Sequence, residues 1–168
     1  MQRPQEPQLA AIWDAAARVP DPEIPVISIA DLGILREVGQ KADGTPVITI
    51  TPTYSGCPAM DTIANDVVAA VEPLGLGTPH VEFSLSPAWS TDWISEAGRQ
   101  ALKDYGIAPP VRRTRTPGVV PLTITMPVEC PRCGSRNTTL LTRFGSTSCK
   151  ALYTCRDCLE PFDYFKEH

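Results

Sequence analysis

The stretch Thr51–Val71, TPTYSGCPAMDTIANDVVAAV, decides the fold because two kinds of apolar pattern meet in it. Apolar residues alternate just before it, which is typical of a strand, and they recur at helical spacing in its second half. Between the two patterns a Ser-Gly turn is followed by Cys57 and Pro58. Proline is favoured at the first helical position. The sequence therefore predicts a strand, a tight turn and a helix, with Cys57 at or next to the helix N-cap.

Cys57 is the candidate reactive group of this stretch. A thiol at a helix N-terminus faces unpaired N–H groups and the positive end of the helix dipole, and both lower its pKa. The resulting thiolate is the form that attacks a substrate or binds a metal ion. The alternative is a buried structural cysteine, because free cysteine is among the most buried residue types.

Composition limits the classes of function. The 168 residues allow one domain of about 100–150 residues and a small module. The net charge of −4 argues against nucleic-acid binding, which needs a basic surface. The sequence has no apolar run of about 18 residues and no signal-peptide core at its start, so we expect no membrane association and a cytoplasmic location. Cytoplasmic thiols stay reduced, so the six cysteines indicate metal or redox chemistry.

The remaining patterns predict an α+β fold. We expect a small mixed sheet of three strands, or slightly more, packed with helices and followed by a small β-rich zinc ribbon. Asp43-Gly44 is typical of a hairpin turn, and Trp89 is expected in the core, with a partner surface as the alternative. The expected helices are 8–18, 58–74 and 92–105, and the expected strands are 34–38, 47–51 and 81–85. The expected parts are a disordered segment 1–7, an α/β domain 8–105, a linker 106–126 rich in proline and arginine, and a ribbon 127–168.

Asp21 and Glu23 stand in a loop that prolines make rigid. The pattern of strands allows this loop and the Cys57 turn to lie at the same end of one sheet. A turn with solvated charges is the alternative interpretation.

The C-terminal part holds two Cys-x-x-Cys pairs, Cys130–Cys133 and Cys155–Cys158. This spacing lets two turns present four thiolates to one tetrahedral ion, with Zn–S distances of about 2.3 Å. A module this small cannot fold by apolar burial alone, so we expect one structural zinc ion per chain. The same thiolates could hold iron or an iron–sulfur cluster. Cys149 belongs to neither pair: it is either a spare thiol or a partner of Cys57 in a shared site.

These residues give the chain a family resemblance over nearly its whole length. Residues 8–105 resemble the metal–sulfur cluster biosynthesis domain of bacterial SufT-type proteins and of the eukaryotic cytosolic iron–sulfur targeting factor. The resemblance is closer to one branch, the D (also called J) subunit of ring-1,2-phenylacetyl-CoA epoxidase. The segments that carry the resemblance are Asp21–Pro25, Ile29–Ile34, Thr51–Ala59, Cys130–Cys133, Phe144–Tyr153 and Glu160–Lys166.

The resemblance implies an accessory, non-catalytic role in a multicomponent monooxygenase of aerobic phenylacetate catabolism. The oxygenase of that system carries a di-iron site, and its reductase carries flavin and a [2Fe–2S] cluster. The chain would assemble or insert these centres, so the oxygenase and reductase subunits are the implied partners. Iron–sulfur carrier proteins and a second copy of the chain are further candidates. Carried over, Cys57 would be a transient ligand of iron or of a cluster, with Asp21 and Glu23 beside it.

Two other functions stay open. An enzyme with Cys57 as nucleophile would need a base, and the only histidines, His80 and His168, stand in no motif that supplies one. A structural subunit would dock on the oxygenase through its zinc ribbon without handling iron.

Overall fold

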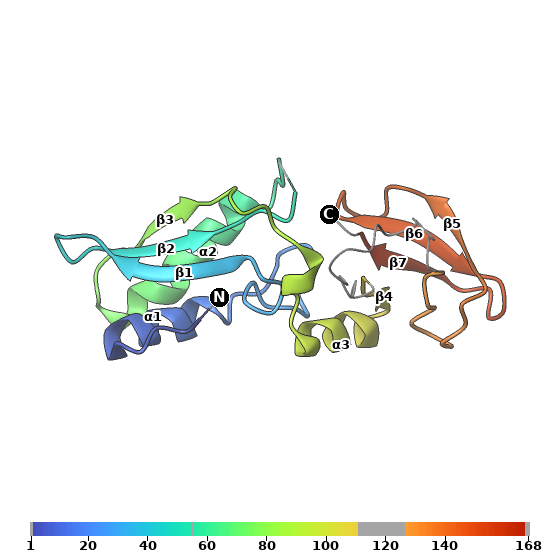
Figure 1. The fold of residues 1–168 in the computed structure, drawn as a ribbon, viewed down its shortest axis with the longest axis horizontal. Helices are drawn as coiled ribbons and strands as arrows, with labels where there is room; N and C mark the ends of the chain where they lie inside the picture. The colour runs from blue at the N-terminus through green and yellow to red at the C-terminus, as the bar shows by residue number, and fades with distance from the viewer. Residues whose placement is uncertain (1, 55, 111–126, 167–168) are drawn as a thin grey trace, which may run out of the picture. The chain divides into compact units, whose positions relative to one another are not determined.

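The computed structural model describes residues 2–54, 56–110 and 127–166. The chain divides into an N-terminal unit, residues 1–98, and a C-terminal unit that begins at Arg99 (Figure 1). Each unit has its own sheet, of three and four strands, which confirms the predicted α+β class. Within the described ranges, no helix is long and apolar enough to cross a membrane.

The N-terminal unit packs two helices against one side of a small mixed sheet (Figure 1). Strands β1 and β2 form the predicted hairpin, with Gly44 at φ +84° in its turn. Strand β3 pairs with β2 in parallel, and helix α2 makes the crossover between them. The elements are α1 (Pro7–Ala16), β1 (Leu35–Gln40), β2 (Pro46–Ile50), α2 (Met60–Val71), β3 (His80–Phe83) and the 3-10 turns η1 (Glu72–Leu74) and η2 (Thr91–Trp93).

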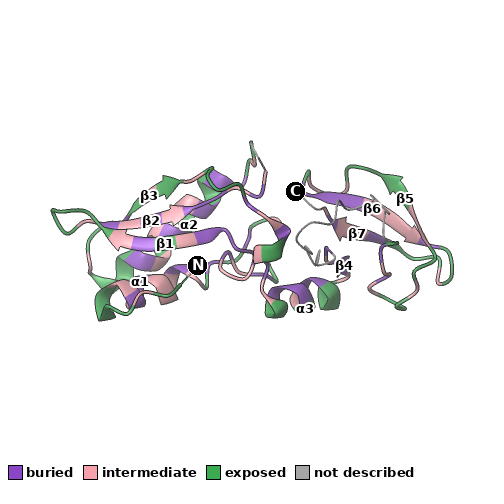
Figure 2. Cartoon of the chain, in the orientation of Figure 1, coloured by how far each residue is buried: buried purple, intermediate pink, exposed green. Residues whose placement is uncertain are grey.

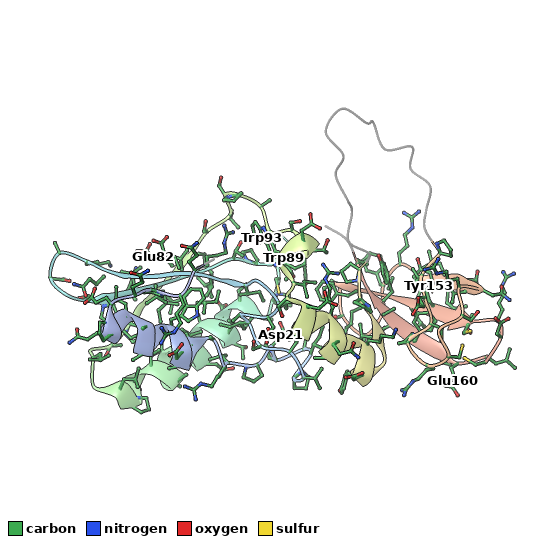
Figure 3. All side chains as sticks on the ribbon, turned by 60° about the horizontal axis from the view of Figure 1, so that its bottom comes forward. Asp21, Glu82, Trp89, Trp93, Tyr153 and Glu160 are labelled. Carbon is green, nitrogen blue, oxygen red and sulfur yellow. The ribbon has the colours of Figure 1, made fainter. Side chains whose placement is uncertain are left out.

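The core of this unit lies between the sheet and the helices. Every second residue of β2 is buried, and so is one stripe of α2, as Figure 2 shows in purple. Trp89 is buried as expected, and its indole N–H donates to the Leu32 carbonyl at 3.0 Å. The side chains around Trp89 are drawn in Figure 3. The Trp89 bond ties the segment after β3 to the segment before β1.

Several boundaries differ from the sequence-based expectation: the helix expected at 92–105 begins only at Glu96, after η2, and the helix expected at 8–18 ends at Ala16. Helix α2 begins at Met60 with Ala59 as its N-cap, so Cys57 lies two residues before the cap. Residues 57–59 form a turn instead, in which the Met60 N–H donates to the Cys57 carbonyl at 3.5 Å. At the start of the chain, Pro7 already belongs to α1, and the Arg3 guanidinium pairs with Asp14 at 2.6 Å within the segment expected to be disordered.

The C-terminal unit contains helix α3 (Glu96–Tyr105), which begins just before the division, and a sheet of order β4-β7-β6-β5. Its strands are β4 (Ile107–Ala108), β5 (Thr138–Thr142), β6 (Lys150–Cys155) and β7 (Pro161–Phe165). Strand β6 pairs antiparallel with β5 and with β7, whereas β4 pairs with β7 in parallel. A small core of Ala108, Val128, Cys130, Cys155 and Phe162 lies beside the cysteine pairs.

Strand β4 lies in the segment that the sequence assigns to the linker. Ile107 and Ala108 are only 4% and 2% exposed, because they pair with Asp163 and Tyr164 of β7. Two residues are too few to show a strand period, so the sequence carries no signal for this pairing. The remainder of the expected linker, residues 111–126, lies outside the described residues.

Candidate metal centres

The four ribbon cysteines converge on one point. The Sγ atoms of Cys130, Cys133, Cys155 and Cys158 all lie within 4.8 Å of one another. The Cys130–Cys158 and Cys133–Cys155 sulfur distances are 3.8 Å and 3.6 Å. A tetrahedral ion with Zn–S bonds of about 2.3 Å places its sulfurs about 3.8 Å apart. The cluster therefore has the dimensions of a four-thiolate zinc site, and these four residues would hold the ion.

Tight turns in the backbone produce this convergence. In the first pair, the Gly134 N–H donates to the Cys130 carbonyl at 2.9 Å, and Gly134 takes φ +75°. In the second pair, the Cys155 N–H donates to the Glu160 carbonyl at 3.0 Å, and Leu159 takes φ 65°. Figure 3 shows sulfur atoms, in yellow, close to Glu160. In both turns, a backbone hydrogen bond and a residue with positive φ set the positions of the two sulfurs.

Asp157 joins the two turns through its side chain. Its carboxylate accepts hydrogen bonds from Ser135 Oγ at 2.5 Å and from Asn137 Nδ2 at 2.7 Å. These bonds hold the pKa of Asp157 below its usual value. Asp157 lies inside the second cysteine pair, whereas Ser135 and Asn137 follow the first, so the carboxylate links the two pairs independently of any metal. The Cys-Arg-Asp-Cys spelling places an acidic residue between the two thiols, but its partners Ser135 and Asn137 lie too far along the chain for the sequence to predict the contact.

The ribbon thiols differ strongly in acidity. Hydrogen bonds from the backbone N–H of Cys158, and further from Asp157, lower the pKa of Cys155 to about 7 although burial opposes this. The Ser135 N–H acts in the same direction on Cys133, but the neighbouring Cys158 sulfur and burial prevail and raise its pKa to about 12. One thiol is thus ready to ionise, and binding of a metal ion releases the protons of the others.

Cys57 lies in a different environment, in the loop between β2 and α2. The loop is attached to the sheet where the Thr51 N–H donates to the Ile34 carbonyl at 2.9 Å. It then turns at Tyr54, whose carbonyl accepts from the Cys57 N–H at 3.3 Å. The Cys57 side chain is half-buried, so the thiol keeps access to solvent.

Asp21 shapes the acidic loop. Its Oδ1 accepts from the backbone N–H groups of Glu23 at 2.8 Å and Ile24 at 2.9 Å. The Asp21 N–H donates in turn to the Ile27 carbonyl at 2.9 Å. Asp21 is 6% exposed and Glu23 half-buried, so the solvated turn considered as an alternative does not describe Asp21.

The acidic loop lies close enough to Cys57 to change its acidity. Burial, first, and then the charges of Glu23 and Asp21 raise the pKa of the Cys57 thiol, while the Ala59 N–H and the Tyr54 hydroxyl oppose them. The predicted lowering of this pKa is therefore wrong. Burial of the sulfur and the charges of two carboxylates disfavour the thiolate more than the single N–H of Ala59, at the helix N-cap, favours it.

Cys149 belongs to the C-terminal unit and lies outside the four-sulfur cluster. It is buried just before β6, with its Sγ 3.0 Å from Thr147 Oγ1. Cys57 belongs to the N-terminal unit, so a site shared by these two thiols stays a prediction.

Comparison with known proteins assigns the family. The family model "PaaD zinc beta ribbon domain" matches residues 115–166, and the model "Iron-sulfur cluster assembly protein" matches residues 9–82. The chain is 47% identical over 160 residues to an Escherichia coli protein described as the D-type component of 1,2-phenylacetyl-CoA epoxidase, covering 95% of this chain and 93% of that protein. The chain belongs to the D-type family of phenylacetyl-CoA epoxidase components.

Two further relatives match the N-terminal unit of this D-type family member. An "Fe-S protein maturation auxiliary factor" from Porphyromonas gingivalis is 40% identical over 77 residues, which are 45% of this chain and 72% of that protein. A crystal structure of a domain of unknown function, DUF59, from Bacillus anthracis superposes with a TM-score of 0.53 at 28% identity, covering 58% of this chain and 93% of that one. The predicted family and fold are thereby confirmed.

Proposed function

We propose that the chain is an accessory, non-catalytic subunit of the phenylacetyl-CoA epoxidase system and supplies iron or an iron–sulfur centre to its oxygenase or reductase. The observation that carries this proposal is the half-buried thiol of Cys57, whose pKa is raised by burial and by the charges of Glu23 and Asp21, although the metal-sized cluster among the described residues is that of the ribbon. A thiolate and carboxylates are ligands that iron accepts. The family assignment supports the epoxidase as the client system, and the name of the Porphyromonas gingivalis relative supports the maturation role.

The residues around Cys57 favour transfer over storage. One sulfur and two carboxylates are too few ligands to enclose an iron ion, so the cargo keeps positions for a ligand of the client. The raised pKa of Cys57 means that a proton competes with the metal for the sulfur. Binding of the cargo releases the thiol proton, and return of that proton frees the cargo.

The ribbon has a separate role in this proposal. Its four thiolates would hold a structural zinc ion, which stabilises the C-terminal unit and presents no open position to a cargo. An iron ion or cluster at the ribbon is distinguished from zinc by metal analysis and by visible absorbance.

Co-expression tests the role of Cys57. The oxygenase and reductase subunits are produced with the wild-type chain, with Cys57→Ser or with Cys149→Ser, and their iron content and activity are measured. We expect Cys57→Ser to leave the clients iron-poor, whereas the iron content obtained with Cys149→Ser tells whether this second thiol shares the site. Full iron content of both clients with Cys57→Ser contradicts the proposal.

The second candidate is a structural subunit that docks on the oxygenase through its ribbon and handles no iron. The four-sulfur site favours this second candidate, because four thiolates complete the shell of one ion. A ribbon of this kind can keep a docking surface folded without exchanging its metal. In this case the Cys57→Ser variant binds the oxygenase and supports full activity. An iron loss in the clients despite normal binding of the variant excludes it.

A further inference from the structure

Strand β5 forms one edge of the ribbon sheet. Among the described strands it pairs only with β6, and every residue from Thr138 to Thr142 is half-buried or exposed. Leu140 and Leu141 are 43% and 55% exposed, and Phe144 just beyond the strand is 68% exposed. An edge strand also presents outward N–H and C=O groups that another strand can pair with.

The apolar side chains are not needed to complete the ribbon core. Leu140 pairs with Tyr153 and Thr142 with Leu152, so Leu141 is the extra residue of a β-bulge. The core cluster beside the cysteines contains none of Leu140, Leu141 and Phe144. Three large apolar side chains therefore stand at one edge, where they contribute little to folding of the unit.

Two cations lie just past the end of β5, beside Phe144: Arg143, and Lys166 from the residue after β7. Lys166 Nζ is 4.9 Å from the centre of the Phe144 ring and 3.3 Å from the Arg143 carbonyl. Within the described ranges, neither Arg143 nor Lys166 has a carboxylate at ion-pair distance. The described ribbon residues, 127–166, hold 6 basic and 4 acidic residues, so basic residues are in slight excess there.

We propose that the β5 edge, defined as Thr138–Thr142 with Arg143, Phe144 and Lys166, binds an extended segment of another protein that carries both apolar residues and carboxylates. The segment adds as a further strand to β5, its apolar side chains pack on the leucines and Phe144, and its carboxylates pair with Arg143 and Lys166. The inference stands on the ribbon alone and does not depend on metal transfer at Cys57.

A displayed library of random 12-residue peptides tests this proposal. The zinc-loaded full-length chain selects the peptides, and the dissociation constants of the winners are measured against three variants. Leu140→Thr/Leu141→Thr removes the apolar edge, and Arg143→Glu/Lys166→Glu reverses the charge. Leu74→Thr is the control, because Leu74 is 40% exposed but lies in the N-terminal unit.

We expect the selected peptides to be acidic and rich in β-branched or aromatic residues. The leucine variant and the charge variant should each weaken binding by about tenfold or more, and the charge variant should lose more at low salt than at high salt. Leu74→Thr should bind as the wild type does. Unchanged zinc content in every variant shows that the ribbon has kept its fold.

Three results overturn the proposal. One is an absence of enriched peptides, and another is selection of peptides that bind the leucine variant as tightly as the wild type. The third concerns a second copy of the chain, whose acidic N-terminal residues could occupy the edge. If sedimentation shows a dimer that Leu140→Thr/Leu141→Thr dissociates, the occupant is this chain itself.

Discussion

The two thiol-bearing regions of this chain are built on opposite principles. In the ribbon, four sulfurs lie within 4.8 Å of one another and tight backbone turns hold them. In the N-terminal unit, burial and then the charges of Glu23 and Asp21 raise the pKa of a single half-buried thiol, Cys57. The ribbon offers four thiolates for one resident ion, whereas the described residues around Cys57 gather no comparable cluster of ligand atoms. Under the proposed function, this difference would separate a zinc ion that stabilises the fold from an iron cargo that is passed on.

The largest effect is expected from removal of one ribbon sulfur. Cys155→Ser should reduce bound zinc from about one ion per chain to almost none and unfold the C-terminal unit, because structural zinc contributes about 10–16 kcal/mol of apparent binding free energy in small domains. Elemental analysis and two-dimensional NMR measure this. Cys149→Ser is the matched control, and a zinc loss in that variant would show that the site extends beyond four sulfurs.

Loss of the Asp157 link between the two cysteine pairs should have a smaller but measurable effect on zinc binding. Asp157→Ala removes the acceptor of Ser135 and Asn137, so the empty site loses part of its preorganisation. We expect zinc affinity to fall by about 10–100-fold, as for other groups that orient metal ligands. Competition with a chromogenic chelator measures it. Asp157→Asn keeps one acceptor oxygen, so its zinc affinity should lie between those of the wild type and Asp157→Ala. Equal zinc affinity of all three proteins would disprove the link.

The next largest effect is expected from a substitution in the acidic loop, at Asp21, and it concerns the free energy of unfolding. Asp21→Ala leaves the Glu23 N–H without its acceptor and the Ile24 N–H with only the Asp21 carbonyl at 3.3 Å, and an unsatisfied buried group costs about 1–3 kcal/mol. Urea unfolding followed by tryptophan fluorescence measures the change in the free energy of unfolding. Asp21→Asn should recover part of the loss. An unchanged unfolding midpoint for Asp21→Ala would mean that this loop does not depend on the carboxylate.

The smallest effect concerns the acidity of Cys57. The charge of Glu23 raises the pKa of this thiol, so Glu23→Gln should lower that pKa and make Cys57 alkylation a few times faster at neutral pH. In the wild type, alkylation of Cys57 should become fast only above the pH range in which an ordinary thiol ionises, because the raised pKa favours the neutral thiol. Peptide mapping after iodoacetamide treatment of the zinc-loaded protein gives the rate. Glu37→Gln, in β1, is the control, and identical rates in all three would remove Glu23 from the site.

Local signals in the sequence account for much of this structure. The spacing of apolar residues predicted the strand, turn and helix around Cys57, and Asp43-Gly44 predicted the hairpin. The two Cys-x-x-Cys pairs indicated the ribbon because both turn geometry and ligand identity are local.

The properties that the sequence did not reveal are tertiary. The pKa of Cys57 depends on its burial and on carboxylates from a distant loop, and neither follows from its position before a helix. Strand β4 exists only because β7 provides its partner. The contacts of Asp157 join two segments that the residues of β5 and β6 separate.

The packing of Trp89 has a practical consequence for spectroscopy. All three tryptophans, Trp13, Trp89 and Trp93, belong to the N-terminal unit, and the Trp89 indole is fixed to the Leu32 carbonyl. Emission from these indoles therefore reports on that unit, while the charge-transfer absorption of Co²⁺ bound to ribbon thiolates reports on the other. One sample carries two optical signals, and a single heating ramp can follow the two units separately.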